Sequence, residues 1–383
     1  MRSLLRSHGY LWAVLFAVRC AANDLAFVGD AACAPCHQSE FNAYHQTAHY
    51  LTSQWPTKDS IHGKFSPDGN IFHTGDTNLI FEMSATEAGH FQKAVRTVSP
   101  TRVGHRAERF DLVIGSGRKG QTYAFWKSNL LFQLPVSYWT ALDAWVNSPG
   151  YPDGVANFER PVTPRCLECH ATTFTSLAPP TNRYNPASLV LGITCEKCHG
   201  PGGEHTARFR SPTPPKLHTE FAILNPATFA RARQMDTCGF CHAGGGKPIA
   251  PALTFVPGAE LDKYFEFPKA DPNAPVDVHG SSVQLLEKSR CFQSSQTMTC
   301  STCHNVHGPQ RDLAAFAVKC LTCHKVETCG QFPKLGHKLD TQCVVCHMPL
   351  QTTSLIVSTV NGKRVRPEVR NHQIGIFPEV TLP

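Results

Sequence analysis

The stretch CSTCHNVH, residues 300–307, places two cysteines and a histidine within five positions and adds a second histidine three residues later. Its first part, Cys-x-x-Cys-His, occurs seven times in the 383-residue chain, whereas a shuffled chain of this composition would contain it about 0.04 times. The seven copies end at His37, His170, His199, His242, His304, His324 and His347. A pattern repeated so far beyond chance must decide how the chain folds.

This pattern supplies the groups that attach a haem covalently. Two cysteines three positions apart can each form a thioether with one vinyl group of the porphyrin, and the next histidine can bind the iron. Cysteine pairs of this spacing also bind zinc or form redox disulfides, but neither alternative explains a histidine after every pair. We therefore expect seven c-type haems, with the seven motif histidines as proximal iron ligands. The expected attachment residues are Cys33, Cys36, Cys166, Cys169, Cys195, Cys198, Cys238, Cys241, Cys300, Cys303, Cys320, Cys323, Cys343 and Cys346.

The second axial ligand of the irons is expected to be histidine as well. Outside the motifs and the N-terminal segment twelve histidines remain, but the chain has only five methionines. His307 follows His304 by three residues, which reach at most about 10–11 Å, too little to pass around a macrocycle. If His307 binds iron, it must bind the iron of a neighbouring haem. The alternative is a surface or supporting histidine.

Residues 1–22 resemble an export signal. Arg2 and Arg6 precede a short apolar run over 10–18, and small residues near Ala22 offer a cleavage site. The alternative, a membrane anchor, would need about 20 apolar residues, and no later stretch is long enough to cross a membrane.

The charge argues against a nucleic-acid partner. Removal of the three arginines of the signal lowers the formal net charge from +7 to +4, and fourteen propionates would bring the ferrous holoprotein to about −10. The chain is 41% hydrophobic and contains 29 prolines and 27 glycines. It is therefore poor in long regular elements, and we expect haems to form much of its core.

The motifs are unevenly spread along the chain. The first is separated from the rest by 128 residues, whereas the other six lie within residues 166–347. Short β-branched and aromatic runs in the gap predict a small antiparallel β-rich insertion, with a hairpin at TYAFWKSNLLFQL, residues 122–134. Residues 38–54 are predicted as a helix, and VNGKR, residues 360–364, as a second hairpin. The expected organisation is a signal peptide (1–22), a first haem-binding segment (23–59), the β-rich insertion (60–145), a six-haem domain (146–350) and a C-terminal tail packed on that domain (351–383).

Several stretches resemble the multihaem c-type cytochromes related to cytochrome c-554, a tetrahaem electron carrier. They are CHQSEFNAYHQTAHYLTSQ (36–54), QLPVSYW (133–139), NSPGY (147–151), CLECHATTF (166–174), CEKCHGPGGEH (195–205), FVPGAELDKYF (255–265), MTCSTCHNVHGPQRD (298–312) and CHMP (346–349). The resemblance implies a mainly α-helical and irregular multihaem cytochrome fold, bis-histidine ligation and electron transfer along closely packed haems. The chain differs from the tetrahaem carrier in having seven motifs and a long insertion.

The resemblance also implies which histidines are distal iron ligands. His49, His205 and His307 match the distal histidines of the family, and His279, His337 and His372 are similar to further ones. The seventh partner is left open among His45, His62, His73 and His105.

These features predict an exported electron carrier, periplasmic or extracellular, that passes single electrons between redox partner proteins. Association with a membrane-bound oxidoreductase is compatible with this role. The alternatives are a multihaem reductase or oxidase that acts on a small nitrogen or sulfur compound at one haem with an open position, or a subunit of an extracellular haem wire. No catalytic residue is predicted.

Two cysteines outside the signal and the motifs remain, Cys291 and Cys329. We expect them to form a disulfide, because an exported protein meets an oxidising compartment. The alternative is a pair of free thiols.

Overall fold

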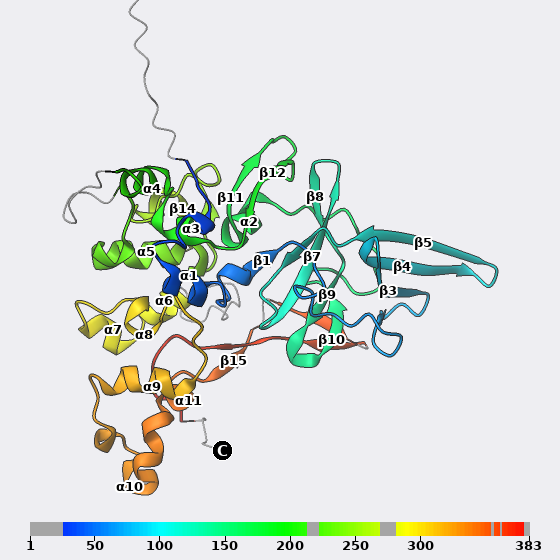
Figure 1. Cartoon of the computed structure of the whole chain (residues 1–383). Coiled ribbons are helices and arrows are strands. Elements are labelled where there is room, and N and C mark those ends of the chain that lie inside the picture. The colour runs from blue at the N-terminus through cyan, green and yellow to red at the C-terminus, as the bar shows by residue number, and fades with distance from the viewer. Residues whose placement is uncertain (1–25, 213–221, 269–280, 354–355, 361, 379–383) are drawn as a thin grey trace, which may run out of the picture.

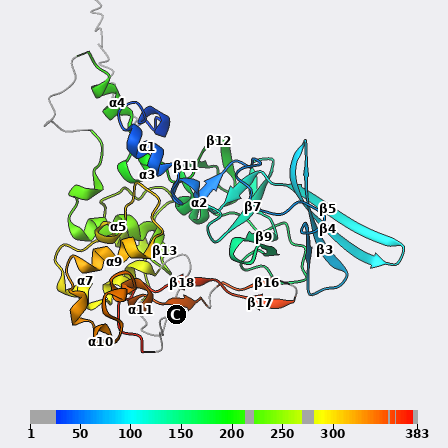
Figure 2. The ribbon, with the colours of Figure 1, turned by 60° about the horizontal axis from the view of Figure 1, so that its bottom comes forward.

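The computed structural model of the protein describes residues 26–212, 222–268, 281–353, 356–360 and 362–378. A part made of β-sheets lies on one side of the molecule and a part made of short helices on the other, and strands near the C-terminus extend between them (Figure 1, Figure 2). The expected signal, residues 1–22, and His279 fall outside the described residues. Within the described ranges no helix is long and apolar enough to cross a membrane.

The first segment contains the 3-10 helix η1 (Asp30–Ala32), α1 (Gln38–Tyr44), the 3-10 helix η2 (Tyr50–Thr52) and β1 (Ser53–Gln54). The helix predicted over 38–54 is therefore wrong beyond Tyr44. The hydroxyl of Thr47 donates to the carbonyl of Tyr44 at 2.7 Å, and the ring of His45 stacks on that of Tyr50 at 3.7 Å. These local contacts compete with helical hydrogen bonds, so the chain turns and enters β1.

Two antiparallel sheets form the β-rich part. The first has the order β2-β3-β4-β5, with β2 (Ile71–His73), β3 (Leu79–Thr86), β4 (Gly89–Ser99) and β5 (Arg102–Arg109). The second has the order β1-β6-β7-β9-β10, and β8 pairs with β7; its strands are β6 (Leu112–Ile114), β7 (Gly120–Lys127), β8 (Leu130–Gln133), β9 (Val136–Trp139) and β10 (Ala144–Asn147). The hairpin predicted at 122–134 is confirmed, because Lys127 pairs with Leu130 across a two-residue turn that begins at Ser128 with φ 57°.

The two sheets share one aromatic core. Phe110 stacks on Tyr123 with ring centroids 4.2 Å apart, and Trp145 packs edge-on against Tyr138 at 5.1 Å. Gln92 of β4 is fully buried, and its side chain both donates to the carbonyl and accepts from the N–H of Val136 in β9, each at 3.0 Å. The sheets, β1 included, therefore form a single β module, which we define as residues 53–147.

The rest of the chain consists of short helices and small two-stranded sheets. The helices are α2 (Pro164–His170), α3 (Cys195–His199), α4 (Gly203–Phe209), α5 (Arg231–His242), α6 (Ser282–Glu287), α7 (Arg290–Ser294), α8 (Cys300–Cys303), α9 (Leu313–Leu321), α10 (Phe332–Leu335) and α11 (Cys343–His347). The strands are β11 (Ala171–Ser176) with β12 (Tyr184–Leu191), and β13 (Lys247–Pro248) with β14 (Phe265–Glu266).

Hydrophobic packing is sparse in this helical part. A cluster around Leu167 and Tyr184 is shared with the β module, and a small one is formed by Phe240, Leu261 and Phe265. Between residues 281 and 353, all of which are described, the buried hydrophobic side chains form no such cluster. The short helices of this stretch therefore pack on one another with little apolar contact.

The C-terminal strands connect the two parts. β15 (Leu350–Thr352) pairs with β18 (Glu368–Arg370), and β16 (Ser358–Val360) pairs with β17 (Lys363–Val365). The second pair confirms the hairpin predicted at 360–364. Arg370 donates to the carbonyl of Met348 at 2.8 Å, and Lys119 of the β module donates to the carbonyl of Glu368 at 2.8 Å. The tail thus contacts the β module as well as the segment of motif VII.

The disulfide predicted between Cys291 and Cys329 is not formed, because both residues are free thiols. Cys291 is the electrostatic neighbour of Cys303 and Cys320, whose pKa values it raises. Cys329 acts in the same way on Cys343 and Cys346. The two thiols therefore lie beside different Cys-x-x-Cys-His motifs.

Candidate haem-binding sites

Each motif, numbered I to VII in chain order, forms about one helical turn. Motifs II, III, IV and VII lie within α2, α3, α5 and α11, and motif V occupies α8 and the residue after it. Motif VI begins at the end of α9, and motif I forms a turn before α1. In motifs I, V and VI the histidine N–H donates to the carbonyl of the first cysteine at 3.0 Å. Residues at i, i+3 and i+4 share one helix face, so each turn directs two thiols and an imidazole to the same side.

Three motif histidines are oriented through the ring nitrogen Nδ1. His170 Nδ1 lies 2.8 Å from the hydroxyl of Thr52, His199 Nδ1 lies 2.8 Å from the carbonyl of Leu224, and His347 Nδ1 lies 2.7 Å from the carbonyl of Gly375. Histidines that bind a metal through Nε2 commonly hold the other ring nitrogen in this way. Sequence reasoning missed these partners, because a threonine or a carbonyl far away in the chain carries no local signal.

The structure places four motif histidines opposite a second histidine. The ring centroids of His37 and His205 are 6.4 Å apart, those of His49 and His242 are 6.0 Å apart, those of His199 and His307 are 6.0 Å apart, and those of His304 and His372 are 6.3 Å apart. A metal–imidazole bond is about 2 Å long and a ring nitrogen lies about 1.1 Å from its centroid, so two histidines on one iron have centroids roughly 6.2 Å apart. The spacing of all four pairs therefore fits one iron between the rings.

Desolvation by the surrounding protein favours the neutral state in five of these rings, and the neutral imidazole is the form that binds metal. Loss of hydration lowers the pKa of His242 to about 4 and also lowers the pKa values of His49, His199, His304 and His372.

The remaining candidate ligands are not paired in this way. The side chain of His337 is 71% exposed, and its ring lies against Phe332 and near Asp340. Within the described ranges, neither His324 nor His347 has a second histidine ring in contact. His279 cannot be placed.

The four residues left open for the seventh position lie elsewhere. His45 bonds Asp30 at 2.7 Å and stacks on Tyr50, and the ring of His62 lies over Gly117. His73 on β2 and His105 on β5 are exposed. None of the four makes a ring contact with a motif histidine among the described residues.

Cysteines of different motifs lie in contact with one another. Four such pairs lie close enough to shift each other's pKa: Cys33 and Cys195, Cys169 and Cys241, Cys238 and Cys300, and Cys320 and Cys343. In the first three pairs one pKa is lowered and the other raised, as where the pKa of Cys169 falls to about 7 while that of Cys241 rises. These contacts make neighbours of motifs I and III, II and IV, IV and V, and VI and VII.

Buried cations lie between motifs II, III and IV. Lys197 donates to the carbonyl of Thr172 at 3.3 Å, and burial lowers its pKa. Nη1 of Arg165 is buried without a hydrogen-bond partner, 3.6 Å from the carboxylate of Glu168. Two buried cations against one carboxylate leave positive charge uncompensated, which suits a further anion such as a haem propionate. Together with the thiol and imidazole donors, this orphaned nitrogen shows that the residues present fit a c-type haem.

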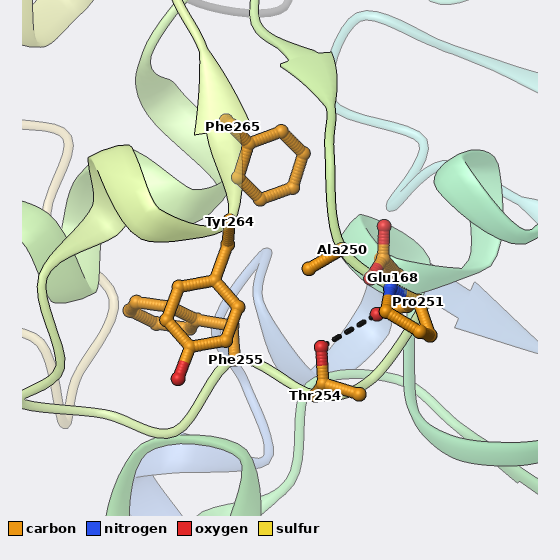
Figure 3. Close-up of a pocket in the computed structure, with 7 residues that line it drawn as sticks. All are labelled: Glu168, Ala250, Pro251, Thr254, Phe255, Tyr264 and Phe265. Carbon is orange, nitrogen blue, oxygen red and sulfur yellow. Dashed lines mark hydrogen bonds between the residues drawn. The ribbon is translucent and has the colours of Figure 1, made fainter.

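A small cavity beside α2 is lined by Glu168, Ala250, Pro251, Thr254, Phe255, Tyr264 and Phe265 (Figure 3). Thr254 donates to the carbonyl of Pro251 at 2.6 Å, and Glu168 accepts from the N–H of Leu253 at 2.9 Å. The space admits essentially no water-sized molecule, so it is a packing gap rather than a substrate site. Among the described residues no group of three or more His, Cys, Asp or Glu side chains is arranged to hold a bare metal ion.

One known protein family is similar to part of this chain. The family described as cytochrome c554 and c-prime matches residues 153–200, which contain motifs II and III. No curated protein matches the chain.

Two solved structures match the chain. The outer cell wall cytochrome OcwA superimposes with a TM-score of 0.52 at 17% identity, over 91% of this chain and 79% of that one. An undecahaem cytochrome from the S-layer of Carboxydothermus ferrireducens gives a TM-score of 0.40 at 18% identity, over 92% of this chain and 52% of that one. The expected resemblance to multihaem c-type cytochromes is thereby confirmed, and the chain has the fold of a multihaem cytochrome.

Proposed function

We propose that the protein is an exported heptahaem c-type cytochrome that carries single electrons between redox partner proteins. The observation that carries this proposal is the 6.0–6.4 Å separation of four histidine pairs. Each pair contains one motif histidine and one distant histidine, as two axial ligands of one iron would. When bound, haem supplies one-electron chemistry through the ferrous and ferric states of its iron.

The residues of the chain have three tasks in this function. The motif cysteines anchor the groups, so that none is lost when its iron changes charge. The facing imidazoles would hold an iron from both sides at motifs I, III, IV and V, and an iron held so would favour electron exchange over substrate binding. The cysteines of motifs II, IV and V lie near one another, as do those of motifs VI and VII, so haems attached there would be neighbours between which electrons could pass.

Axial histidines also connect the motifs. His307, three residues after motif V, faces His199 of motif III, and His205, six residues after motif III, faces His37 of motif I. His49, which follows motif I, faces His242 of motif IV. Any displacement of one motif would therefore disturb a neighbouring iron, so the ligands hold the spacing that rapid transfer requires.

The localisation rests on two observations. The N-terminal 22 residues resemble an export signal, and the structural neighbours are described as cytochromes of an outer cell wall and of an S-layer. We infer an exported protein whose partners are donors and acceptors on the cell-envelope side of the membrane.

The proposal is tested by electron paramagnetic resonance and carbon monoxide binding on the purified holoprotein. Low-spin ferric signals should account for at least four of the irons, and these should not bind carbon monoxide after reduction. A spectrum dominated by high-spin iron, with carbon monoxide bound at most sites, would reject bis-histidine electron transfer in favour of an enzyme with open haem positions.

A further inference from the structure

The β module contains a surface cleft that the haem chemistry does not use. The cleft has a volume of about 350 Å³ and is lined by Trp55, Pro56, Glu87, Ala88, Gly89, His90, Arg109, Phe110, Asp111 and Trp126. These residues come from the end of β1, the β3–β4 turn, the junction of β5 and β6, and β7. The volume lies in the range of small-molecule sites, roughly 300–1,000 Å³.

The part of the chain that forms the cleft carries no haem motif. Residues 38–165 contain no cysteine, although the remaining sequence averages one motif about every 30 residues over 166–347. The β module therefore cannot attach a haem of its own. An insertion of this size with its own core and a cleft is better explained by binding than by electron transfer.

Tryptophan provides the apolar surface of the cleft. Trp55 is 49% exposed although it is the largest hydrophobic side chain in its segment, and Trp126 also lines the cleft. Leaving an indole in water forfeits the free energy of burying it, so an open indole beside a cleft indicates a ligand that covers it. A flat ring with C–H groups on its face would cover the indole of Trp55.

The polar groups in the same cleft are both donors and acceptors. Asp111 accepts from Nε of Arg109 at 2.7 Å and from the N–H of Trp126 at 2.8 Å, which fixes the guanidinium at the rim. Among the described residues, the terminal nitrogens of Arg109, the carboxylate of Glu87 and the ring of His90 have no hydrogen-bond partner. Burial lowers the pKa of His90, so its ring is neutral and offers one donor and one acceptor.

This combination distinguishes between two kinds of flat ligand. A fused aromatic compound would cover the indoles but would leave most of these donors and acceptors desolvated and without partners, which disfavours its binding. The hydroxyl groups around a pyranose ring both donate and accept, and the C–H face of the ring packs on an indole. We propose that the β module binds carbohydrate, with Trp55 as the stacking platform and Arg109, Glu87 and His90 as the hydrogen-bonding rim.

The competing occupant, a redox-active aromatic compound, would bind close to a haem motif. Trp55 follows Thr52 by three residues, and the hydroxyl of Thr52 lies 2.8 Å from His170 of motif II. The test therefore has to include both classes of ligand.

Isothermal titration calorimetry on the holoprotein should compare chitohexaose, cellohexaose and anthraquinone-2,6-disulfonate. At least one of the two sugars should bind, and Trp55→Ala should weaken that binding at least tenfold, whereas Trp55→Phe should retain part of it. Arg109→Gln should also weaken binding several-fold. Arg102→Gln is the matched control, because Arg102 is exposed at the opposite end of the same strand and does not line the cleft. Thermal unfolding and the haem spectrum of each variant check that the fold is intact.

Three results would overturn the proposal. The first is that neither sugar binds the wild-type protein at millimolar concentration. The second is that a sugar binds Trp55→Ala, Arg109→Gln and the wild-type protein equally. The third is that only the anthraquinone binds and that Trp55→Ala abolishes its binding. The last result would assign the cleft to aromatic redox compounds.

Discussion

Replacement of His307 by alanine is the sharpest single perturbation of the ligand scheme. The His307 ring faces that of His199 with centroids 6.0 Å apart and an interplanar angle of 15°. His199 belongs to motif III, whereas His307 follows motif V in the sequence. The variant His307→Ala should therefore remove the sixth ligand from the haem attached to Cys195 and Cys198 and leave the haem of Cys300 and Cys303 unchanged.

The size of the effect follows from the geometry. One iron in seven, about 14% of the total, should become high-spin or bind water, and one carbon monoxide should bind per reduced molecule. The potential of that haem should rise, because a basic imidazole that favours ferric iron is lost. His307 is exposed, so the loss of its side-chain packing should cost less than about 0.5 kcal/mol. All seven haems should remain attached, since their thioethers do not involve His307.

The assay combines electron paramagnetic resonance, carbon monoxide titration and a redox titration of wild type and variant. His105→Ala is the matched control, because His105 is an exposed histidine on β5 without a ring contact to a motif histidine in the described part of the chain. A second background, Cys195→Ser with Cys198→Ser, removes the haem that His307 should serve. In that background His307→Ala should add no further carbon monoxide site, as expected for two changes at one iron.

Two results would refute the reasoning. If His307→Ala keeps the low-spin signals and potentials of the wild type, His307 is an ordinary surface histidine. If the new high-spin iron persists in the background that lacks the motif III haem, His307 serves another iron and the pairing with His199 is wrong.

Three further predictions follow from other parts of the structure. His49→Ala should open the iron of motif IV, because His49 faces His242 at 6.0 Å, and a new high-spin signal from motif I instead would contradict the pairing. Gly115→Ala should lower the free energy of unfolding by about 2–3 kcal/mol, because Gly115 has φ +110° and a Cβ would lie 2.6 Å from the carbonyl oxygen of Gly120. Gly330→Ala, which meets nothing within 4 Å, should change it by less than about 0.5 kcal/mol, and equal unfolding midpoints for the two variants would count against the turn geometry. Burial lowers the pKa of His90 in the folded state, so the unfolded state takes up this proton first as the pH falls below 6.5, and the free energy of unfolding should decrease from there toward the folded pKa. His90→Gln should reduce this decrease, as measured by urea titrations at pH 7 and pH 5. An unchanged pH dependence of the unfolding free energy would contradict the prediction.

Local patterns in the sequence predicted local structure well. The hairpins at 122–134 and 360–364 are confirmed, because short polar turns between β-branched runs leave the chain few alternatives. The antiparallel sheets of the insertion also match the prediction. The helix predicted over 38–54 is present only to Tyr44, because the contact of Thr47 with Tyr44 and the stacking of His45 on Tyr50 end it there.

Long-range features could not be predicted in the same way. Nothing near His49 indicates that it faces His242, about 190 residues away, because that contact depends on how the motifs pack in space. The predicted disulfide assumed that the two leftover cysteines meet, whereas Cys291 and Cys329 lie beside different motifs. The cleft residues Trp55 and Arg109 lie 54 positions apart and carry no shared motif, so only the fold brings them together.

The central claim is that the chain carries seven covalent haems, and the intact mass of the purified, denatured protein tests it most directly. After acid extraction of any unattached haem, the mass should equal that of the polypeptide cleaved after Ala22 plus seven haem units, and the pyridine haemochrome assay should give seven haems per chain. A mass that corresponds to four or five haems would contradict the account, because some motifs would then serve another purpose.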